Sequence, residues 1–310
     1  MTNASIMVIE NNNLVFTSLD SVSFSRDICS LLPSSLRDYF IFDSKHHFGW
    51  IAYDNSKVVG YVLGQTWESD GEKIGFVSHL EVSSGHRNSG IGSELIRLFE
   101  EGAAECDKII FVVIENEQSH EAALKMLRKN HWAEPRIAKF SYRSTIEKFF
   151  EFSQWPAKIP RYRYQHYFFS WSELTAEELQ QLDEDRGPDS WRDNPFPSPP
   201  TAFGERFEPS TSLGVRRGGK VIGWCITGTY GPDTLLYGSF FLHKQHRNTG
   251  IAVSMFLESL RRQQEAGISQ IVGFVDKDNI AVTRLHERLF PPHILSKNAV
   301  FTVEKLLHRK

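Results

Sequence analysis

Cysteine is scarce in this chain, which also lacks a long apolar run and an excess of basic residues. Its three cysteines among 310 residues are odd in number and far apart, so neither a disulfide framework nor a zinc site is predicted. No apolar segment reaches the roughly 18 residues of a membrane helix, and no secretory leader is expected. A net charge of −3 argues against binding nucleic acid through a strongly basic surface. These absences favour a cytoplasmic protein without a membrane span or a metal site.

Two common phosphate-binding loops are missing as well. The chain has no Gly-x-x-x-x-Gly-Lys-Ser/Thr loop, and no Gly-x-Gly-x-x-Gly that follows a first strand and precedes an acidic residue. What remains is an ordinary globular composition, with 40% hydrophobic and 24% charged residues. The length suits two domains of about 150 residues, each with its own core.

An internal repeat supports two domains. Three blocks match in the same order at nearly constant separation: 57–61 (KVVGY) with 220–224 (KVIGW), 86–91 (HRNSGI) with 246–251 (HRNTGI), and 145–149 (TIEKF) with 302–306 (TVEKL). Matches that keep their order over most of each half indicate that one whole domain was duplicated.

Each copy carries a glycine-containing turn between a β-rich run and an amphipathic helix. The helix begins with small residues, Gly90 and Gly92 in the first copy and Gly250 and Ala252 in the second. Small residues let a ligand approach the backbone, and the free N–H groups of a first helical turn attract anions. A single turn of this kind could be a plain helix cap, but two in matching contexts favour a phosphate or pyrophosphate site.

The patterns Arg-x-x-Gly-x-Gly and Arg-x-x-Gly-x-Ala closely resemble the acetyl-CoA loop of the GCN5-related N-acetyltransferase (GNAT) family. The resemblance implies that this loop holds the CoA pyrophosphate and that the thioester lies between splayed fourth and fifth strands. The resemblance also implies that the donor, acetyl-CoA or another acyl-CoA, binds to two loops and to the start of one helix. These residues are Arg87, Asn88, Ser89, Gly90, Ile91 and Gly92, then Arg247, Asn248, Thr249, Gly250, Ile251 and Ala252, and finally Asn279.

The order of elements agrees with this resemblance. Periodicity and turn residues predict a strand at 14–18, a helix at 23–40, a hairpin at 46–65, a strand at 76–82, the glycine loop at 85–92, a helix at 93–105, a buried strand at 108–114, a helix at 119–129 and a strand at 137–146. The predicted fold class is α/β, with two tandem GNAT-like domains that each have a mixed central sheet flanked by helices. We expect domains at 1–152 and 164–310, joined by a proline-containing linker at 153–163.

Three local features have competing interpretations. His46 and His47 are adjacent in a strand and face opposite ways, so a metal site is not expected there. The run from Arg161 to Tyr164 fits an ordinary strand edge better than a nucleic-acid contact. The proline- and aromatic-rich stretch 185–210 is either a loop that binds the acceptor or a packed surface loop.

The resemblance implies direct attack of an amine on a thioester, which needs a base for the amine and an acid for the thiolate. In the family a tyrosine on the helix after the fifth strand commonly serves as the acid. His286 takes that slot in the second copy, with Asn279 at a slot that often contacts pantetheine. The first copy has Leu127 and His120 instead, and a leucine cannot donate a proton.

The candidate bases are in the first copy, whereas the candidate acid is in the second. The first copy has Glu81 beside its fourth strand and Glu115 at the end of its buried strand. The second copy has phenylalanines there, so Tyr237, His243 or a water would have to serve. We favour the second copy slightly as the catalyst. His286 could equally be a solvated helix residue, and the two glutamates could be ordinary surface charges.

The sequence therefore predicts an acyl-CoA-dependent N-acyltransferase that acts on a primary amine of a small molecule or peptide. One variant uses a long acyl chain or an acyl-carrier protein to modify a lysine-like amine. A second hypothesis is a CoA-binding sensor or scaffold without turnover, since each copy lacks part of the expected machinery.

Overall fold

The computed structural model describes residues 7–9, 14–18, 47–69, 71–115, 120–159, 164, 167–186, 190–191, 207–231, 233–290 and 296–307. The helix expected over 23–40, the side chains of His46 and His47, and most of the stretch 185–210 lie outside these residues. Contacts divide the chain into two compact units. Unit 1 comprises Met1–Ala138 and Ala299–Lys310, and unit 2 comprises Lys139–Asn298.

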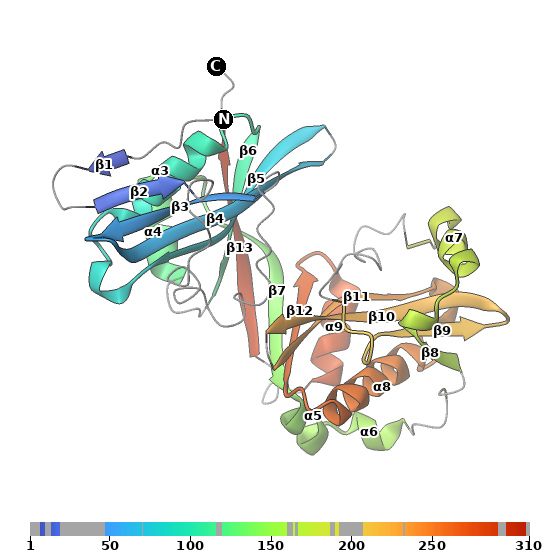
Figure 1. Ribbon diagram of the computed structural model, residues 1–310. Helices are drawn as coiled ribbons and strands as arrows, with labels where there is room; N and C mark the ends of the chain where they lie inside the picture. The colour runs from blue at the N-terminus through green and yellow to red at the C-terminus, as the bar shows by residue number, and fades with distance from the viewer. Residues whose placement is uncertain are drawn as a thin grey trace. The chain divides into compact units, whose positions relative to one another are not determined.

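Unit 1 is a mixed sheet with helices. Its elements are β1 (Met7–Ile9), β2 (Leu14–Ser18), β3 (His47–Asp54), β4 (Lys57–Ser69), β5 (Glu72–Val82), the short 3-10 helix η2 (Ser84–His86), α3 (Ile91–Gly102), β6 (Lys108–Ile114), α4 (His120–Lys129) and, from Ala299 on, β13 (Ser296–Leu306). The strand order is β1-β2-β3-β4-β5-β6-β13. Of these neighbours only β5 and β6 run parallel (Figure 1).

The predicted hairpin is confirmed as β3 and β4. Asn55 and Ser56 have positive φ, 47° and 67°, at the two-residue turn that joins the strands. Two positive φ values match the right-handed twist of the flanking strands, and asparagine tolerates this conformation well.

Helix α3 packs on one face of the unit 1 sheet. Its buried side chains include Leu95, Ile96 and Phe99, each 0% exposed. Glycines on β4 let the helix approach closely, because a Cβ added at Gly64 would lie 2.3 Å from the Phe99 ring. Gly60 and Gly64 therefore face α3, and the alternate residues of β4 point to the opposite face.

Unit 2 repeats this arrangement. Its elements are β7 (Arg136–Thr145, in this unit from Lys139), α5 (Ile146–Phe152), α6 (Trp155–Lys158), β8 (Phe168–Ser170), η5 (Trp171–Glu173), α7 (Ala176–Glu184), β9 (Leu213–Arg217), β10 (Lys220–Gly231), β11 (Thr234–Leu242), η7 (Lys244–His246), α8 (Ile251–Glu265), β12 (Gln270–Asp276) and α9 (Ile280–Leu289). The strand order is β7-β12-β11-β10-β9-β8, and β11 and β12 form the parallel pair. The predicted capping box of Thr175 and Glu178 is present at the start of α7.

The two copies exchange their last strands. Strand β7, which ends the first copy in sequence, pairs with β12, with Tyr142 opposite Gly273. Strand β13, which ends the second copy, pairs with β6, with Phe301 opposite Val113 (red beside green in Figure 1). The compact units therefore differ from the contiguous ranges 1–152 and 164–310 expected above. The expected linker 153–163 includes the short helix α6.

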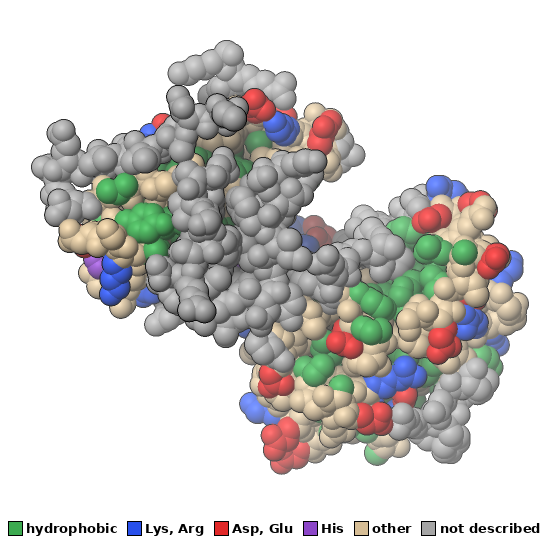
Figure 2. All heavy atoms as spheres, viewed as in Figure 1, with side chains coloured by type: hydrophobic (Ala, Val, Ile, Leu, Met, Phe, Trp, Pro, Cys, Tyr) green, Lys and Arg blue, Asp and Glu red, His purple; other side chains and the backbone are tan. Residues whose placement is uncertain are grey.

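No helix among the described residues is long and apolar enough to cross a membrane. On the face of unit 2 drawn in Figure 2, acidic and basic side chains are interspersed, and no continuous basic area is visible there.

Candidate functional site

The parallel strands β5 and β6 part halfway along unit 1. They pair from Ile74 opposite Lys108 to Val77 opposite Phe111, and the pairing stops there. At the same point the register of β5 against β4 shifts, because Leu63 is opposite His79 and Gly64 is opposite Val77. Ser78 is thus the extra residue of a β-bulge, a distortion that bends a strand and increases its twist. The bulge directs β5 away from β6.

Unit 2 has the same split in its sheet. Strand β11 pairs with β12 from Thr234 to Tyr237, and its register against β10 shifts around Gly238. Gly238 is the repeat equivalent of Ser78. Among the described residues of each unit, no parallel strand pairs with the backbone edge beyond the bulge.

The glycine turns that follow β5 and β11 have the same backbone. Gly90 and Gly250 precede α3 and α8 with φ of 90° and 89°, in the left-handed region that favours glycine. The first intrahelical bonds run from Glu94 N to Gly90 O and from Ser254 N to Gly250 O. The three N–H groups at the start of each helix are not used by these helical bonds, so each turn presents donors to an anion.

Side chains hold both turns from inside in the same way. The guanidinium Nε donates to the carbonyl that ends the preceding strand, from Arg87 to Val82 at 3.2 Å and from Arg247 to Leu242 at 2.9 Å. The hydroxyls of Ser89 and Thr249 donate to the carbonyls of His86 and His246, at 2.5 and 2.7 Å. These side chains fix the shape of the turn, and the backbone amides are left to face a ligand.

The two turns differ in what covers them. A Cβ built on Gly90 meets no atom of the described residues within 4 Å. A Cβ built on Gly250 would lie 3.2 Å from the hydroxyl of Tyr164. That hydroxyl donates to the carbonyl of Thr249 at 2.5 Å. The turn of unit 1 is therefore open to a ligand, whereas an aromatic ring lies over the turn of unit 2.

The histidines of the turns have opposite electrostatic surroundings. His86 lies between Ser83 at 2.9 Å and the carboxylate of Asp54 at 3.2 Å. In unit 2, Arg217 is 3.4 Å from His246. Burial first, and then the charges of Arg217 and His243, lower the pKa of His246.

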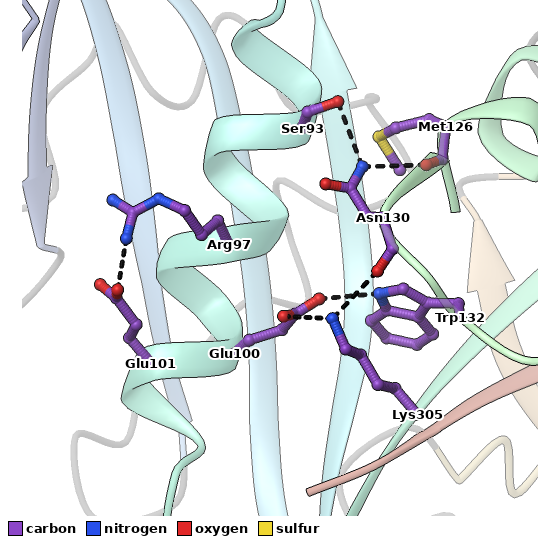
Figure 3. A network of polar contacts seen from close by, with 8 residues as sticks. All are labelled: Ser93, Arg97, Glu100, Glu101, Met126, Asn130, Trp132 and Lys305. Carbon is purple, nitrogen blue, oxygen red and sulfur yellow. Dashed lines mark hydrogen bonds and ion pairs between the residues drawn. The ribbon is translucent and has the colours of Figure 1, made fainter. Parts of the chain in front are cut away.

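A polar network fastens α3 of unit 1 to the C-terminal strand (Figure 3). The carboxylate of Glu100 accepts from Trp132 Nε1 at 2.8 Å and from Lys305 Nζ at 2.6 Å. Asn130 donates to Ser93 Oγ at 3.2 Å, close to the N-terminus of α3. The helix that carries the open turn is thus held in place by a residue of β13.

The carboxylates expected to act as bases in unit 1 have distinct partners. Glu81 is exposed, lies opposite Tyr61 across β4 and β5, and has a side-chain hydrogen bond with it. Burial first, and then the charge of Glu81, raise the pKa of Tyr61. The carboxylate of Glu115 accepts from the backbone N–H of Ala299 at 2.8 Å, so it anchors the start of β13 within this unit.

The residues expected to act in unit 2 are enclosed. The Tyr237 hydroxyl donates to Gln263 at 2.9 Å, and burial raises its pKa well above the ordinary value. The His286 ring stacks on Tyr142 at 4.8 Å, and its Nδ1 lies 2.9 Å from the carbonyl of Val282. Burial lowers the pKa of His286, so its neutral form is favoured.

The remaining two candidates of unit 2 have different partners. Asn279 caps α9, and its side chain accepts from Val282 N at 3.2 Å. His243 lies 3.7 Å from the carboxylate of Asp185 and lines a hollow of about 500 Å³ with Glu178 and Lys220. Each of the four predicted residues of unit 2 thus has its own polar partner: Gln263 for Tyr237, Val282 for His286 and Asn279, and Asp185 for His243.

Sequence reasoning missed one residue beside the split. His79 follows the bulge, opposite Leu63 and therefore on the sheet face away from α3. Burial lowers its pKa to about 4. The internal repeat contained a signal for this residue. It aligns His79 and Glu81 of the first copy with Ser239 and Phe241 of the second, which are buried.

The parted parallel strands and the left-handed glycine turn, each present twice, define the tandem acetyltransferase-like α/β class expected from the sequence. The sequence model of the Acetyltransferase (GNAT) family matches residues 17–132 and 164–290. The chain belongs to this family. Membership indicates N-acetyltransferase activity, and enzymes of this family generally bind acetyl-CoA and act on amine acceptors.

Solved structures share this fold at low sequence identity. A tandem GNAT protein from the clavulanic acid biosynthesis pathway is 16% identical, with a TM-score of 0.63 over 85% of this chain and 84% of that one. A putative acetyltransferase from Pyrococcus horikoshii is 12% identical, with a TM-score of 0.55 over 97% and 91%.

A third similar structure is a GCN5-related glucosamine N-acetyltransferase region of a fungal multi-domain β-N-acetylglucosaminidase, 16% identical with a TM-score of 0.60. The match covers 83% of this chain and 33% of that longer one. No curated protein matches the chain. Among the described residues, no group of three or more histidine, cysteine, aspartate or glutamate side chains is placed to hold a metal ion.

Proposed function

We propose that this protein is an acyl-CoA-dependent N-acyltransferase, in which a primary amine attacks the thioester directly. The observation that carries the proposal is the parting of β5 from β6 at the Ser78 bulge, next to a glycine turn with free N–H groups. The edge of β5 beyond the bulge, where the pairing with β6 has ended, suits an extended, amide-containing chain, which can bond to it as an added strand does.

Unit 1 is the better candidate for the donor site. The open turn at Gly90 admits a pyrophosphate, with the N–H groups of residues 91–93 pointing to it. The corresponding turn of unit 2 lies under Tyr164, and its catalytic candidates Tyr237 and His286 are half-buried, each with a side-chain hydrogen bond to another residue. This assignment reverses the slight preference for the second copy drawn from the sequence.

The reaction needs proton transfers as well as binding. The attacking amine must lose a proton, and the departing thiolate must gain one. The carbonyl oxygen becomes negative in the tetrahedral intermediate, and N–H groups on the edge of β5 that leaves β6 are suitable donors to it. A longer acyl-CoA or an acyl-carrier protein would present the same thioester to this edge.

A sensor or scaffold that binds CoA without turnover is the second candidate. It is favoured by Leu127, which is 0% exposed in the slot where an acid was expected. An enzyme releases free CoA faster when its amine is present, whereas a sensor binds CoA and releases none.

The test combines donor counting with turnover. Native mass spectrometry of the full chain with acetyl-CoA counts bound molecules, and a thiol assay with a panel of amines measures release. Gly90→Glu should abolish donor binding through bulk and charge, and Gly250→Glu is a matched control with the same backbone strain, since the two φ values agree within a degree. Full donor binding by Gly90→Glu would overturn the assignment to unit 1. Absence of thiol release with every amine tested would favour the sensor.

A further inference from the structure

We propose that His79 is the group of unit 1 that accepts the proton of the attacking amine, a role that rests on the proposed acyl transfer. His79 follows the bulge residue Ser78, at the point where β5 leaves β6. Its cross-strand partner is Leu63, whereas Gly64 faces α3. His79 is therefore on the β5 face away from α3, beside the opening in the sheet.

The imidazole is poised to accept a proton. Its Nδ1 is buried, and no group of the described residues hydrogen-bonds to it. An unpaired buried polar atom destabilises a fold, and native folds retain few of them. Burial lowers the pKa to about 4, so the ring is neutral at pH 7. With its hydrogen on Nε2, the neutral ring has Nδ1 free as an acceptor.

Neighbouring strands place two other titratable side chains on this face. Tyr61 of β4 and Glu81 of β5 are opposite each other and hydrogen-bonded. Strand β3 contributes Gly49 and Ile51, the cross-strand partners of Leu63 and Tyr61. The raised pKa keeps Tyr61 protonated, as a donor to Glu81. His79 is thus the neutral nitrogen base that these three strands provide.

The repeat supplies an internal comparison. In unit 2 the positions of Tyr61, His79 and Glu81 hold Trp224, Ser239 and Phe241. Trp224 Nε1 donates to Ser239 Oγ at 2.9 Å, and the rings of Trp224 and Phe241 are 4.8 Å apart. Those side chains are buried, with 0%, 2% and 3% exposure. The same face of unit 2 is therefore packed and has no base at the position of His79.

The proposed step balances as follows. The lone pair of the amine nitrogen forms the C–N bond, and the thioester carbonyl electrons move to oxygen. The nitrogen proton passes to Nδ1 of His79. Collapse of the intermediate restores the carbonyl and breaks the C–S bond, and the thiolate takes a proton, so that His79 returns to its neutral form and the products are an amide and free CoA.

His79→Gln in the full chain tests the step. Glutamine keeps hydrogen-bonding groups but takes no proton near neutral pH, so kcat for thiol release should fall by about 10²- to 10⁴-fold. The acetyl-CoA count and the affinity for it should stay unchanged. Ser239→Ala, the equivalent position of unit 2, should change kcat by less than about twofold.

The possible outcomes distinguish a failure of the His79 role from a failure of the proposed acyl transfer. If the wild type releases thiol and His79→Gln has a near-normal kcat, the role of His79 is overturned, but the proposed acyl transfer is not. A loss confined to KM or donor affinity also overturns it. A wild type that releases no thiol with any amine overturns both proposals.

A pH profile keeps the test decisive if the variant does not fold. With a saturating amine whose own pKa lies well below 6.5, wild-type kcat should remain level as the pH falls through 6.5, and should decline only at lower pH. A decline centred at or above pH 6.5 contradicts a buried, neutral His79 as the base.

Discussion

The hydroxyl of Tyr164 donates a hydrogen bond of 2.5 Å to the carbonyl oxygen of Thr249, in the glycine turn of unit 2. The equivalent turn of unit 1 has the same backbone angles, but no described atom lies within 4 Å of a Cβ placed on Gly90. Two anion turns with one geometry thus differ in access. The difference predicts that the two units bind the donor unequally.

Removal of the Tyr164 ring should open the second turn. We expect one acetyl-CoA per chain in the wild type and two in Tyr164→Ala, counted by native mass spectrometry at saturating donor. Tyr167→Ala is the control, because its ring lies 6.5 Å from that of Tyr164 and its loss leaves Tyr164 over Gly250. A single bound donor in Tyr164→Ala would show that another feature closes unit 2.

Lys305 of the C-terminal strand should stabilise unit 1 through Glu100. The two side chains are only 23% and 16% exposed, and their bond is charge-assisted. Lys305→Met should therefore lower the free energy of unfolding by about 1–3 kcal/mol, measured by urea denaturation. The exposed pair Lys73 and Glu105 is the comparison, and Lys73→Met should lower the free energy of unfolding by clearly less than Lys305→Met does. An equal loss of unfolding free energy in both variants would contradict a stabilising role of the network in Figure 3.

Thr145 should act as a helix cap, whereas its repeat equivalent Thr302 should not. Thr145 Oγ1 accepts from Lys148 N at 3.2 Å and begins α5, but Thr302 lies inside β13 opposite Val112. Thr145→Ala should cost about 1 kcal/mol, since an uncapped N–H loses its partner. Thr145→Ser should restore most of the loss, because serine offers the same acceptor. At Thr302 the serine and alanine variants should not show this difference in the free energy of unfolding, although serine keeps the hydroxyl.

His79 should make unfolding depend on pH. Its folded pKa of about 4 lies below the ordinary value of 6.5, so the unfolded chain binds the proton first as the pH falls. The stabilisation by neutral His79 is complete above pH 6.5 and is lost between pH 6.5 and about 4. His79→Gln should flatten that part of the curve in urea denaturation at a series of pH values. Identical slopes in wild type and variant would contradict the buried, neutral state of His79.

Much of this protein could be predicted from local sequence. The hairpin at Asn55 and Ser56 follows from turn residues that tolerate positive φ, and the capping box of Thr175 and Glu178 follows from residue spacing. The glycine turns were predictable for the same reason, because Gly90 and Gly250 have the left-handed backbone that favours glycine. These features depend on a few neighbouring residues.

The surroundings of the candidate site residues were not predictable in this way. The cover that Tyr164 places over Gly250, the enclosure of Tyr237 and the unpaired Nδ1 of His79 all arise from segments that are distant in sequence. Glu115 illustrates the limit, since its partner Ala299 belongs to the other end of the chain. Burial and contact require the folded chain, and residue type alone does not determine them.

The matching pentapeptides 145–149 and 302–306 show most clearly which features local sequence determines and which depend on tertiary structure. The sequence by itself determined the duplication, the α/β class and the two glycine turns, because periodicity, turn chemistry and internal similarity are properties of the chain. Tertiary structure alone decided that TIEKF starts helix α5 whereas TVEKL continues strand β13. In the helix, Phe149 packs against Phe256 and Phe290. In the strand, residues 302–306 hydrogen-bond to β6, so the partner available at each place overrides a shared local sequence.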